Sequence, residues 1–109
     1  MIANYIKRVV CLVYNMRDMK MDSNQPHVLK YSGDHKGVGL HHDKSDVTIN
    51  LMLSQIGDYS GGGTYFPDAN SLVRLEFGEY LLHPGNAVHS GRPILSGTRY
   101  LMVIFGDRD

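Results

Sequence analysis

Two histidines and one aspartate have the side-chain types and the spacing expected of a metal site. If this segment is extended, His41 and Asp43 project to the same face and His42 to the other. A second histidine from a distant strand would complete a set of two imidazoles and one carboxylate. Such a set leaves three coordination positions open and is typical of non-haem Fe(II) oxygenases. His89, beyond the turn Pro84-Gly85-Asn86, is the candidate for the third ligand, so the pattern predicts one Fe(II) site in an oxygen-using enzyme.

The remaining histidines are weaker candidates, and a His-x-Asp triplet alone is weak support because it often arises by chance. His83 precedes the same turn and is the one rival to His89 as third ligand. Alternatively, it braces a ligand from outside the coordination sphere. We interpret His42 as a residue that packs or meets solvent. Two further histidines are interpreted as surface or loop residues: His27 and His35.

Arg99 opens a segment that is otherwise mostly apolar, Tyr100 to Phe105, and such a run is typical of a buried strand. Burying a guanidinium without an anion is costly, so the sequence predicts an acidic partner for Arg99. Two kinds of partner remain open. The first is an ion pair with Glu76 or Glu79. The second is the far carboxylate of a dicarboxylic co-substrate, held by two parallel hydrogen bonds.

The segment from Val47 to Leu53 alternates in polarity with a period of two, which predicts a strand. Its most apolar residues would share one face, and Thr48 and Asn50 would lie on the opposite face. If that second face lines the interior of a barrel, Thr48 and Asn50 support the Arg99 clamp on a polar ligand. Exposure of both residues to solvent is the alternative, and alternation alone does not distinguish the two.

The chain divides into a helical support over residues 1–22 and a β-barrel core over residues 27–106. Apolar residues at helical spacing predict one amphipathic helix over about residues 2–20. The rest of the chain alternates short strands with glycine-rich turns and indicates no second helix. Strands are expected at 27–31, 47–53, 64–66, 72–75, 79–83 and 98–105, with a turn region over 57–63. Many short strands with frequent turns predict a sandwich or a barrel.

Length and charge fit a single domain of 109 residues without a general affinity for polyanions. Eleven basic residues balance eleven acidic ones, so net charge favours neither nucleic acid nor an anionic membrane as a partner. Cys11 is the only cysteine, which excludes an internal disulfide and a cysteine-rich zinc site. With no signal-peptide pattern and no long apolar stretch, we expect no membrane partner and favour the cytoplasm. The sequence does not indicate an oligomeric state.

Taken together, the motifs resemble those of 2-oxoglutarate- and Fe(II)-dependent oxygenases of the prolyl/lysyl hydroxylase group. The resemblance runs from about His27 to Phe105 and is greatest for the catalytic domain of procollagen lysyl hydroxylases. The segments that carry it are HVLKY, HHDKSDVTIN, DYSGGGTYF, LLHPGNAVH and GTRYLMVIF. The sequence departs from the group in having about one helix, rather than several, before the barrel. That difference leaves open whether the chain is a compact enzyme or part of a longer one.

The resemblance implies a fold and a role for each residue of the site. The implied fold is a double-stranded β-helix, a jelly roll of two facing sheets, with the N-terminal helix packed on the larger sheet. Arg99 would bind the C5 carboxylate of 2-oxoglutarate, and Asn50 and Tyr31 would make further contacts with it. The implied iron ligands are His41, Asp43 and His89.

The implied reaction is hydroxylation of a peptidyl lysine or proline, coupled to decarboxylation of 2-oxoglutarate to succinate and CO₂. Its cofactors and co-substrates would be Fe(II), 2-oxoglutarate and O₂, with ascorbate as an optional further cofactor. Three alternatives remain open. They are a hydroxylase of a small metabolite or free amino acid, a non-catalytic barrel that binds a metal and a small acid, and an oxidative demethylase of nucleic acid. The neutral net charge disfavours the last of these.

Overall fold

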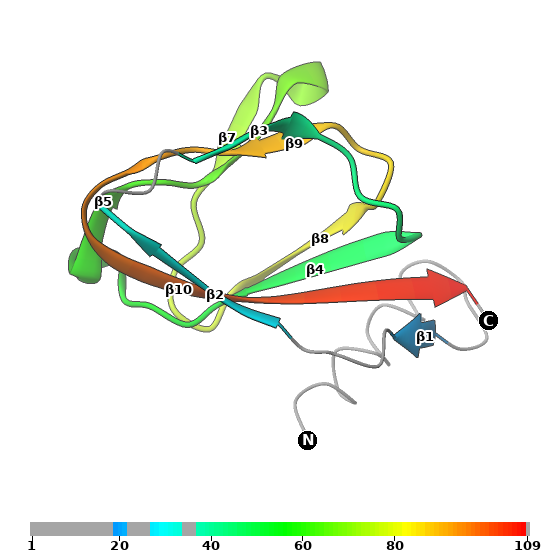
Figure 1. Ribbon diagram of the computed structural model, residues 1–109, viewed down its shortest axis with the longest axis horizontal. Helices are drawn as coiled ribbons and strands as arrows, with labels where there is room; N and C mark the ends of the chain where they lie inside the picture. The colour runs from blue at the N-terminus through cyan, green and yellow to red at the C-terminus, as the bar shows by residue number, and fades with distance from the viewer. Residues whose placement is uncertain (1–18, 22–26, 34–36, 109) are drawn as a thin grey trace.

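The computed structural model describes residues 19–21, 27–33 and 37–108, which form two antiparallel sheets that face each other (Figure 1). The larger sheet contains β1 (Met19–Met21), β2 (His27–Ser32), β4 (Val47–Met52), β5 (Tyr59–Gly61), β8 (Tyr80–Pro84) and β10 (Ile94–Arg108). The smaller sheet contains β3 (Val38–His41), β9 (His89–Gly91), β6 (Thr64–Phe66) and β7 (Ser71–Val73), in that spatial order. Two short 3-10 helices lie in the connections: η1 (Ile56–Asp58) and η2 (Pro67–Ala69).

The path of the chain between the two sheets is that of a jelly roll. After β2 in the larger sheet, the chain enters β3 in the smaller sheet and returns to the larger sheet in β4. It then passes through β6 and β7 of the smaller sheet, and its last three strands, β8, β9 and β10, alternate between the sheets. The mainly β, double-stranded β-helix fold that the sequence predicts is therefore confirmed. The part of the chain that the structure describes contains no helix long and apolar enough to cross a membrane.

The long strand β10 organises the larger sheet. It pairs with β4 along one edge, and with β2 and β1 along the other. In this register Arg99 lies opposite Tyr31 of β2, and Val103 lies opposite Asn50 of β4. Side chains alternate between the faces of a strand, so Arg99 and Val103 share the face that lines the interior. One strand thus pairs with the segments that carry two other residues of the predicted site, Tyr31 and Asn50.

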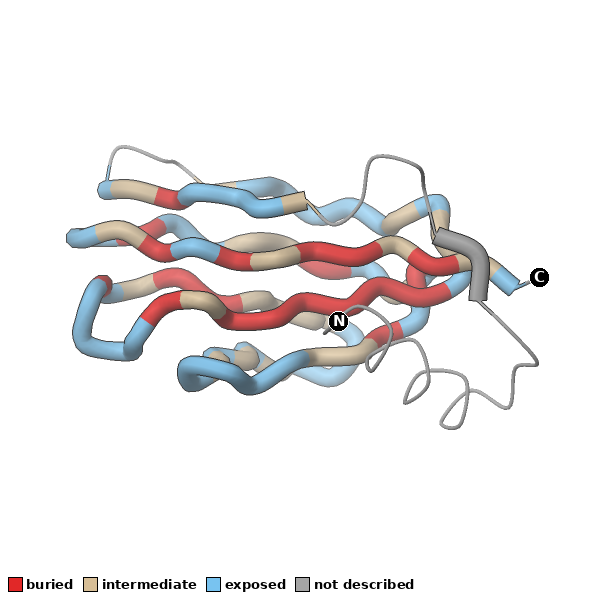
Figure 2. The backbone as a smooth tube through the Cα atoms, turned by 90° about the horizontal axis from the view of Figure 1, so that it is seen from below, coloured by how far each residue is buried: buried red, intermediate tan, exposed pale blue. Residues whose placement is uncertain are grey.

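Both faces of β4 are buried, and the two faces differ in character. Figure 2 shows that the buried residues run along the central strands of the molecule. Val47, Ile49 and Leu51 pack with Ile104 in an apolar cluster on one face. Thr48 and Asn50 lie on the other face with exposed fractions of only 2% and 7%. The solvent-exposed alternative for Thr48 and Asn50 is therefore wrong, because both line the interior.

The predicted helix over about residues 2–20 falls largely outside the described residues, which begin at Met19. Its last two predicted residues, Met19 and Lys20, lie in strand β1 instead. Met19 pairs with Arg108 and Lys20 with Asp107, at the end of β10. That part of β10 extends past β2, so β1 satisfies backbone hydrogen-bonding groups that would otherwise form a sheet edge. Helical periodicity in the sequence contains no information about this distant pairing.

The predicted turn region over 57–63 also contains a strand, and β10 begins earlier than expected. Tyr59 pairs with Gly97 and Gly61 with Ile94, with a register shift between these pairs. Gly61 and Gly97 have φ angles of 77° and 76°, which residues with a Cβ rarely adopt. These two glycines let short, bent segments pair, whereas in the sequence they resemble the ends of strands. The sequence also does not predict β9, which has three residues and no alternation.

The turn after β8 has no room for a side chain at Gly85. A β-carbon there would lie 1.7 Å from the carbonyl oxygen of Ser45, a contact with backbone rather than with a flexible side chain. We expect Gly85→Ala to destabilise the fold by at least the roughly 1–3 kcal/mol typical of overpacking. Gly57→Ala is the matched control, since nothing lies within 4 Å of its added carbon. Chemical denaturation of both variants measures the difference, and equal stability would contradict the packing described here.

Candidate metal centre

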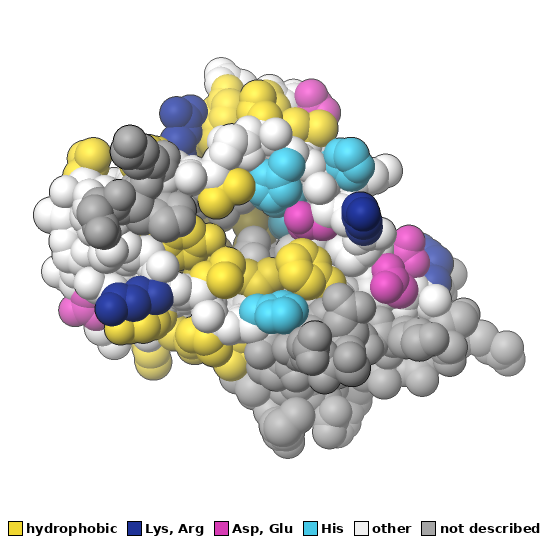
Figure 3. Space-filling model, in the orientation of Figure 1, with side chains coloured by type: hydrophobic (Ala, Val, Ile, Leu, Met, Phe, Trp, Pro, Cys, Tyr) yellow, Lys and Arg dark blue, Asp and Glu magenta, His cyan; other side chains and the backbone are white. Residues whose placement is uncertain are grey.

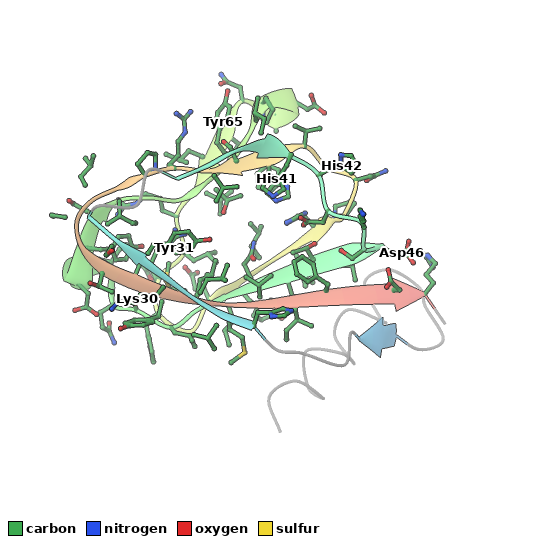
Figure 4. All side chains as sticks on the ribbon, viewed as in Figure 1. Lys30, Tyr31, His41, His42, Asp46 and Tyr65 are labelled. Atoms are coloured by element: carbon green, nitrogen blue, oxygen red, sulfur yellow. The ribbon has the colours of Figure 1, made fainter. Side chains whose placement is uncertain are left out.

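The two predicted histidine ligands face each other across neighbouring strands of the smaller sheet. His41, at the end of β3, pairs directly with His89, at the start of β9. Their ring centroids are 4.4 Å apart. In Figure 4, His41 points into the space between the sheets, whereas His42 points away from it. The prediction that His41 and His42 project to opposite sides therefore agrees with their placement.

A β-bulge in β3 aims His41 at the interior. Val38 pairs with Gly91 and His41 with His89, so three steps along β3 match two steps along β9. Without the extra residue, Val38 and His41 would point to opposite faces. With it, both side chains line the same cavity. Bulges commonly redirect a side chain beside a functional site, and this one turns a ligand inward.

Both histidines are held in the same way by the backbone just before them. The Nδ1 atom of His41 lies 2.8 Å from the Gly39 carbonyl oxygen, and that of His89 lies 2.8 Å from the Ala87 carbonyl oxygen. A carbonyl oxygen only accepts hydrogen bonds, so each Nδ1 carries the hydrogen. Each Nε2 then presents a lone pair, the form in which neutral histidine binds a metal.

Asp43 completes the metal triad, by which we mean His41, Asp43 and His89. The ligand atoms of these residues all lie within 4.8 Å of one another. Oδ1 of Asp43 lies 3.6 Å from Nε2 of His41, and Oδ2 of Asp43 lies 3.7 Å from Nε2 of His89. The backbone N–H of Asp43 donates to the Gly85 carbonyl oxygen at 2.8 Å, which ties the segment after β3 to the turn after β8. The structure thus brings together the three ligands that the sequence predicts.

Thr48 contacts the metal triad directly. Its hydroxyl donates a 2.6 Å hydrogen bond to Oδ2 of Asp43, and Ser45 Oγ lies 3.2 Å from the same hydroxyl. The sequence led us to expect Thr48 beside the co-substrate, whereas in the structure its hydroxyl donates a hydrogen bond to the Asp43 carboxylate. We therefore interpret Thr48 as the residue that orients this ligand.

A cavity of about 170 Å³ lies between the sheets next to the metal triad. Its polar walls contain the remaining residues of the predicted site: Tyr31, Thr48, Asn50 and Arg99. The apolar walls include Leu29, Val38, Leu101, Val103 and Phe105. Figure 3 shows a hollow at the centre of this face, with histidine, acidic and apolar side chains around it. The side chain of His41 is 39% exposed, against 11% for Asp43, so the triad is open to a ligand on the His41 side.

Arg99 is buried in this cavity without a carboxylate partner in the described part of the chain. Only 4% of its surface is exposed, and its Nε atom has no hydrogen-bond partner. Its guanidinium lies 4.6 Å from the ring centroid of Tyr31. Glu76 and Glu79 instead bind each other, through a 2.7 Å hydrogen bond from the Glu76 backbone to the Glu79 carboxylate. The ion pair that the sequence left open is therefore absent, and the positive end of the cavity is available to an acid.

Burial also determines the electrostatics of Arg99. Removal from water lowers the pKa of the guanidinium below its ordinary value, while Tyr31 and Tyr59 oppose that shift. An arginine side chain nevertheless stays protonated in proteins. A buried, charged group with an unused donor is costly unless a bound anion compensates it. This argument favours a carboxylate ligand at Arg99.

His83 packs against the metal triad without belonging to it. Its ring centroid is 4.6 Å from that of His89, and Phe66 lies edge-on at 5.3 Å on another side. Its Nδ1 atom lies 2.8 Å from the Pro84 carbonyl oxygen, and burial lowers its pKa, which favours the neutral form. The structure thus gives His83 a supporting position behind His89. The contact of Phe66 with the histidines of the site was not predicted, because an aromatic residue at the end of a three-residue strand carries no distinctive sequence signal.

Fold and site together define the class: a jelly-roll protein with two histidines and one carboxylate that could hold a metal ion, beside a buried arginine. No family model matches the chain. Over 85 residues it is 42% identical to procollagen-lysine,2-oxoglutarate 5-dioxygenase 1 of Mus musculus and 40% identical to procollagen-lysine,2-oxoglutarate 5-dioxygenase 2 of Homo sapiens. These alignments cover 73% of this chain but only 12% of each relative. Among solved structures, an RmlC-like cupin protein from Desulfovibrio desulfuricans matches with a TM-score of 0.48 and 15% identity, over 84% of each chain.

The hydrogen bond from Thr48 to Asp43 predicts a measurable effect on metal binding. Thr48→Val removes the hydroxyl at nearly constant volume, so the Asp43 carboxylate loses the contact that fixes its orientation. We expect metal affinity to fall by roughly 10- to 100-fold, as is usual when a supporting contact of a ligand is removed. Thr64→Val is the matched control, because Thr64 lines the same cavity without a recorded bond to Asp43. Anaerobic titration with Fe(II) compares the variants, and equal affinities would show that Thr48 does not orient the ligand.

Proposed function

We propose that this protein is an Fe(II)- and 2-oxoglutarate-dependent dioxygenase that hydroxylates a lysine or proline side chain in a peptide. The observation that carries the proposal is the position of Arg99. It is 4% exposed, lacks a carboxylate partner among the described residues and lines the same cavity as the metal triad. A 2-oxo dicarboxylic acid has a metal-chelating end and a carboxylate at its far end. It therefore fits a cavity that has the metal triad in one part of its wall and the buried Arg99 guanidinium in another.

The donor set supports iron as the metal. Two imidazole nitrogens and one carboxylate on one side of an ion leave positions open for a bidentate acid and for oxygen. The His41 and His89 rings present Nε2 in the form that binds a metal, because each Nδ1 is bonded to a backbone carbonyl. One ligand atom from each of His41, Asp43 and His89 lies within 4.8 Å of the others, so the three could hold one ion. This donor set therefore supports Fe(II) as the metal.

In the proposed reaction, iron and 2-oxoglutarate supply the oxidation, while the protein binds, orients and shields. One oxygen atom of O₂ enters the substrate C–H bond as a hydroxyl, and the other enters succinate as CO₂ leaves. Arg99 would hold the C5 carboxylate, and Tyr31 and Asn50, which line the same cavity, would make further contacts with the acid. Leu101, Val103 and Phe105 would keep water from the reacting end. Binding at Arg99 is remote from the reacting bond and contributes to positioning.

The substrate class rests on the relatives rather than on the cavity. The relatives' names specify procollagen-lysine as what they act on, and this chain is 40–42% identical to the two named above over 85 residues. We extend that class to this chain as a peptidyl lysine or proline. A requirement for ascorbate stays a prediction. A barrel that binds metal and acid without turnover uses the same residues, so the experiment must separate binding from reaction.

The test is an anaerobic titration followed by exposure to air. Fe(II) is added first and 2-oxoglutarate second, and we expect a weak visible charge-transfer band from the chelated acid, then succinate once air is admitted. Arg99→Ala should weaken 2-oxoglutarate binding by roughly 10- to 100-fold, the range for losing a hydrogen-bonded charged group. Arg92→Ala is the matched control, because Arg92 is exposed and lies over Tyr65 at 4.6 Å.

Three outcomes would contradict the proposal in different ways. A folded, metal-loaded protein without the band would show that the acid does not chelate the metal. A band without succinate after exposure to air would instead favour the non-catalytic barrel. An Arg99→Ala variant with unchanged 2-oxoglutarate dependence would remove the role assigned to Arg99 while leaving the metal site intact.

A further inference from the structure

A second cavity lies beside the first and shares two of its wall residues. Its volume is about 360 Å³, and both cavities are lined by Asp43 and Phe105. Because Asp43 belongs to the metal triad, a molecule in the second cavity would lie next to a metal ligand. The acid that spans the triad and Arg99 would occupy the first cavity. The second cavity is therefore a candidate for the side chain that is to react at the metal.

One face of β10 lines both cavities and carries opposite charges at its two ends. Alternate residues of a strand share a face, and this face runs from Arg99 in the first cavity to Asp107 in the second. Phe105 pairs with Thr48, whose hydroxyl binds the Asp43 carboxylate, so this part of β10 lies beside the triad. Asp107 is one pleat further along, roughly 7 Å away, in the direction opposite to Arg99. The apolar residues between the two charges are Leu101, Val103 and Phe105.

The Asp107 carboxylate is held in place by one oxygen, and its other oxygen has no recorded partner among the described residues. Oδ1 accepts a 3.0 Å hydrogen bond from the backbone N–H of Asp46. The ion pairs recorded in the described part of the chain are those of Asp43, so Asp107 has no cationic partner there. Lys44 lines the same cavity, but it is exposed, and its long stem lets the ammonium group stay in water. A half-buried carboxylate in a fixed position favours a cationic ligand.

The surroundings of Asp107 suit a cation on a carbon chain. Asp46 is fixed in turn, because its Oδ2 accepts a 2.7 Å hydrogen bond from the backbone N–H of Arg108. In Figure 4, Asp46 lies near the point where β10 ends, and Figure 3 shows acidic side chains to the right of the central hollow, on the same face. The apolar ring of Phe105 lies between these carboxylates and the first cavity. A lysine side chain has a matching form, four methylene groups that end in an ammonium, whereas a proline ring carries no charge.

We propose that Asp107 binds the ammonium group of a substrate lysine whose carbon chain lies against Phe105. The inference rests on the proposed function and narrows its substrate class from a lysine or proline to a peptidyl lysine. An ammonium held one pleat past the triad leaves the carbons of the same side chain beside the metal ligands. Arg99 and Asp107 thus bind the co-substrate and the substrate at opposite ends of one strand. Asp107 selects the substrate and takes no part in breaking the C–H bond.

The experiment compares Asp107→Asn with the wild-type protein, each supplied with Fe(II), 2-oxoglutarate and air, on pools of peptides. The pools have the same mixed flanking residues and differ in the central residue, which is lysine, norleucine or proline. Norleucine keeps the carbon chain of lysine without its amino group. Mass spectrometry measures the peptides that gain one oxygen atom. The wild type should hydroxylate the lysine pool fastest, and Asp107→Asn should raise the apparent KM for that pool roughly 10-fold, as for the loss of a hydrogen bond between charged groups.

Asp107→Asn should leave the apparent KM for the norleucine pool and the affinities for Fe(II) and 2-oxoglutarate unchanged. Its melting temperature should also stay the same, because the amide oxygen can still accept the hydrogen bond from Asp46. Asp68→Asn is the matched control, since it removes one negative charge from an exposed residue of η2 that is not among those lining either cavity. A loss of melting temperature together with weaker 2-oxoglutarate binding would instead make Asp107 a structural residue and overturn the inference.

The remaining outcomes separate this inference from the proposed function. An Asp107→Asn variant that prefers lysine to norleucine as strongly as the wild type would overturn the role of Asp107. A wild type that hydroxylates the proline pool in preference to the lysine pool would do the same. Either result would leave the proposed dioxygenase in place. A wild type that forms no succinate with any pool would overturn both.

Discussion

The register between β3 and β9 is the constraint on which the candidate site depends. It places His41 opposite His89, and the bulge that follows Val38 turns His41 toward the interior. A shift of one residue in a strand moves its side chains to the other face, so a slip here would separate the two imidazoles. Asp43 depends on the same arrangement, because its backbone is bonded to Gly85 in the turn that leads to β9. A few backbone contacts thus position all three ligands.

A second constraint is electrostatic and comes from the opposite sheet. β10 carries Arg99 into the interior, where burial deprives the charge of water and no recorded carboxylate among the described residues replaces it. The smaller sheet contributes His41 and His89 to the walls of the same cavity. The metal triad and the arginine therefore lie on different sheets and meet only in the folded protein. An acid that spans them would stabilise both charged groups at once.

Much of this could be predicted from the sequence, for physical reasons that differ between elements. The alternation from Val47 to Leu53 predicted β4 correctly because both faces of that strand are buried against chemically different surroundings. His41, Asp43, His89 and Arg99 could be proposed from residue type, spacing and motif resemblance, and the structure places all four around one cavity. β1 and β5 were not predicted, because each forms only by pairing with β10. The contact from Thr48 to Asp43 and the position of Asp107 in the second cavity likewise depend on three-dimensional neighbours.

The proposed function requires that one acid contact the metal triad and Arg99 simultaneously. The direct measurement is the affinity for 2-oxoglutarate and for glutarate, with and without a divalent metal, by anaerobic calorimetry. Glutarate keeps both carboxylates but lacks the oxo group that completes the chelate. We expect metal to tighten 2-oxoglutarate binding by roughly 5- to 150-fold, the usual range for coupled ligands, and glutarate binding far less. Equal effects of metal on the two acids, or none on either, would contradict it.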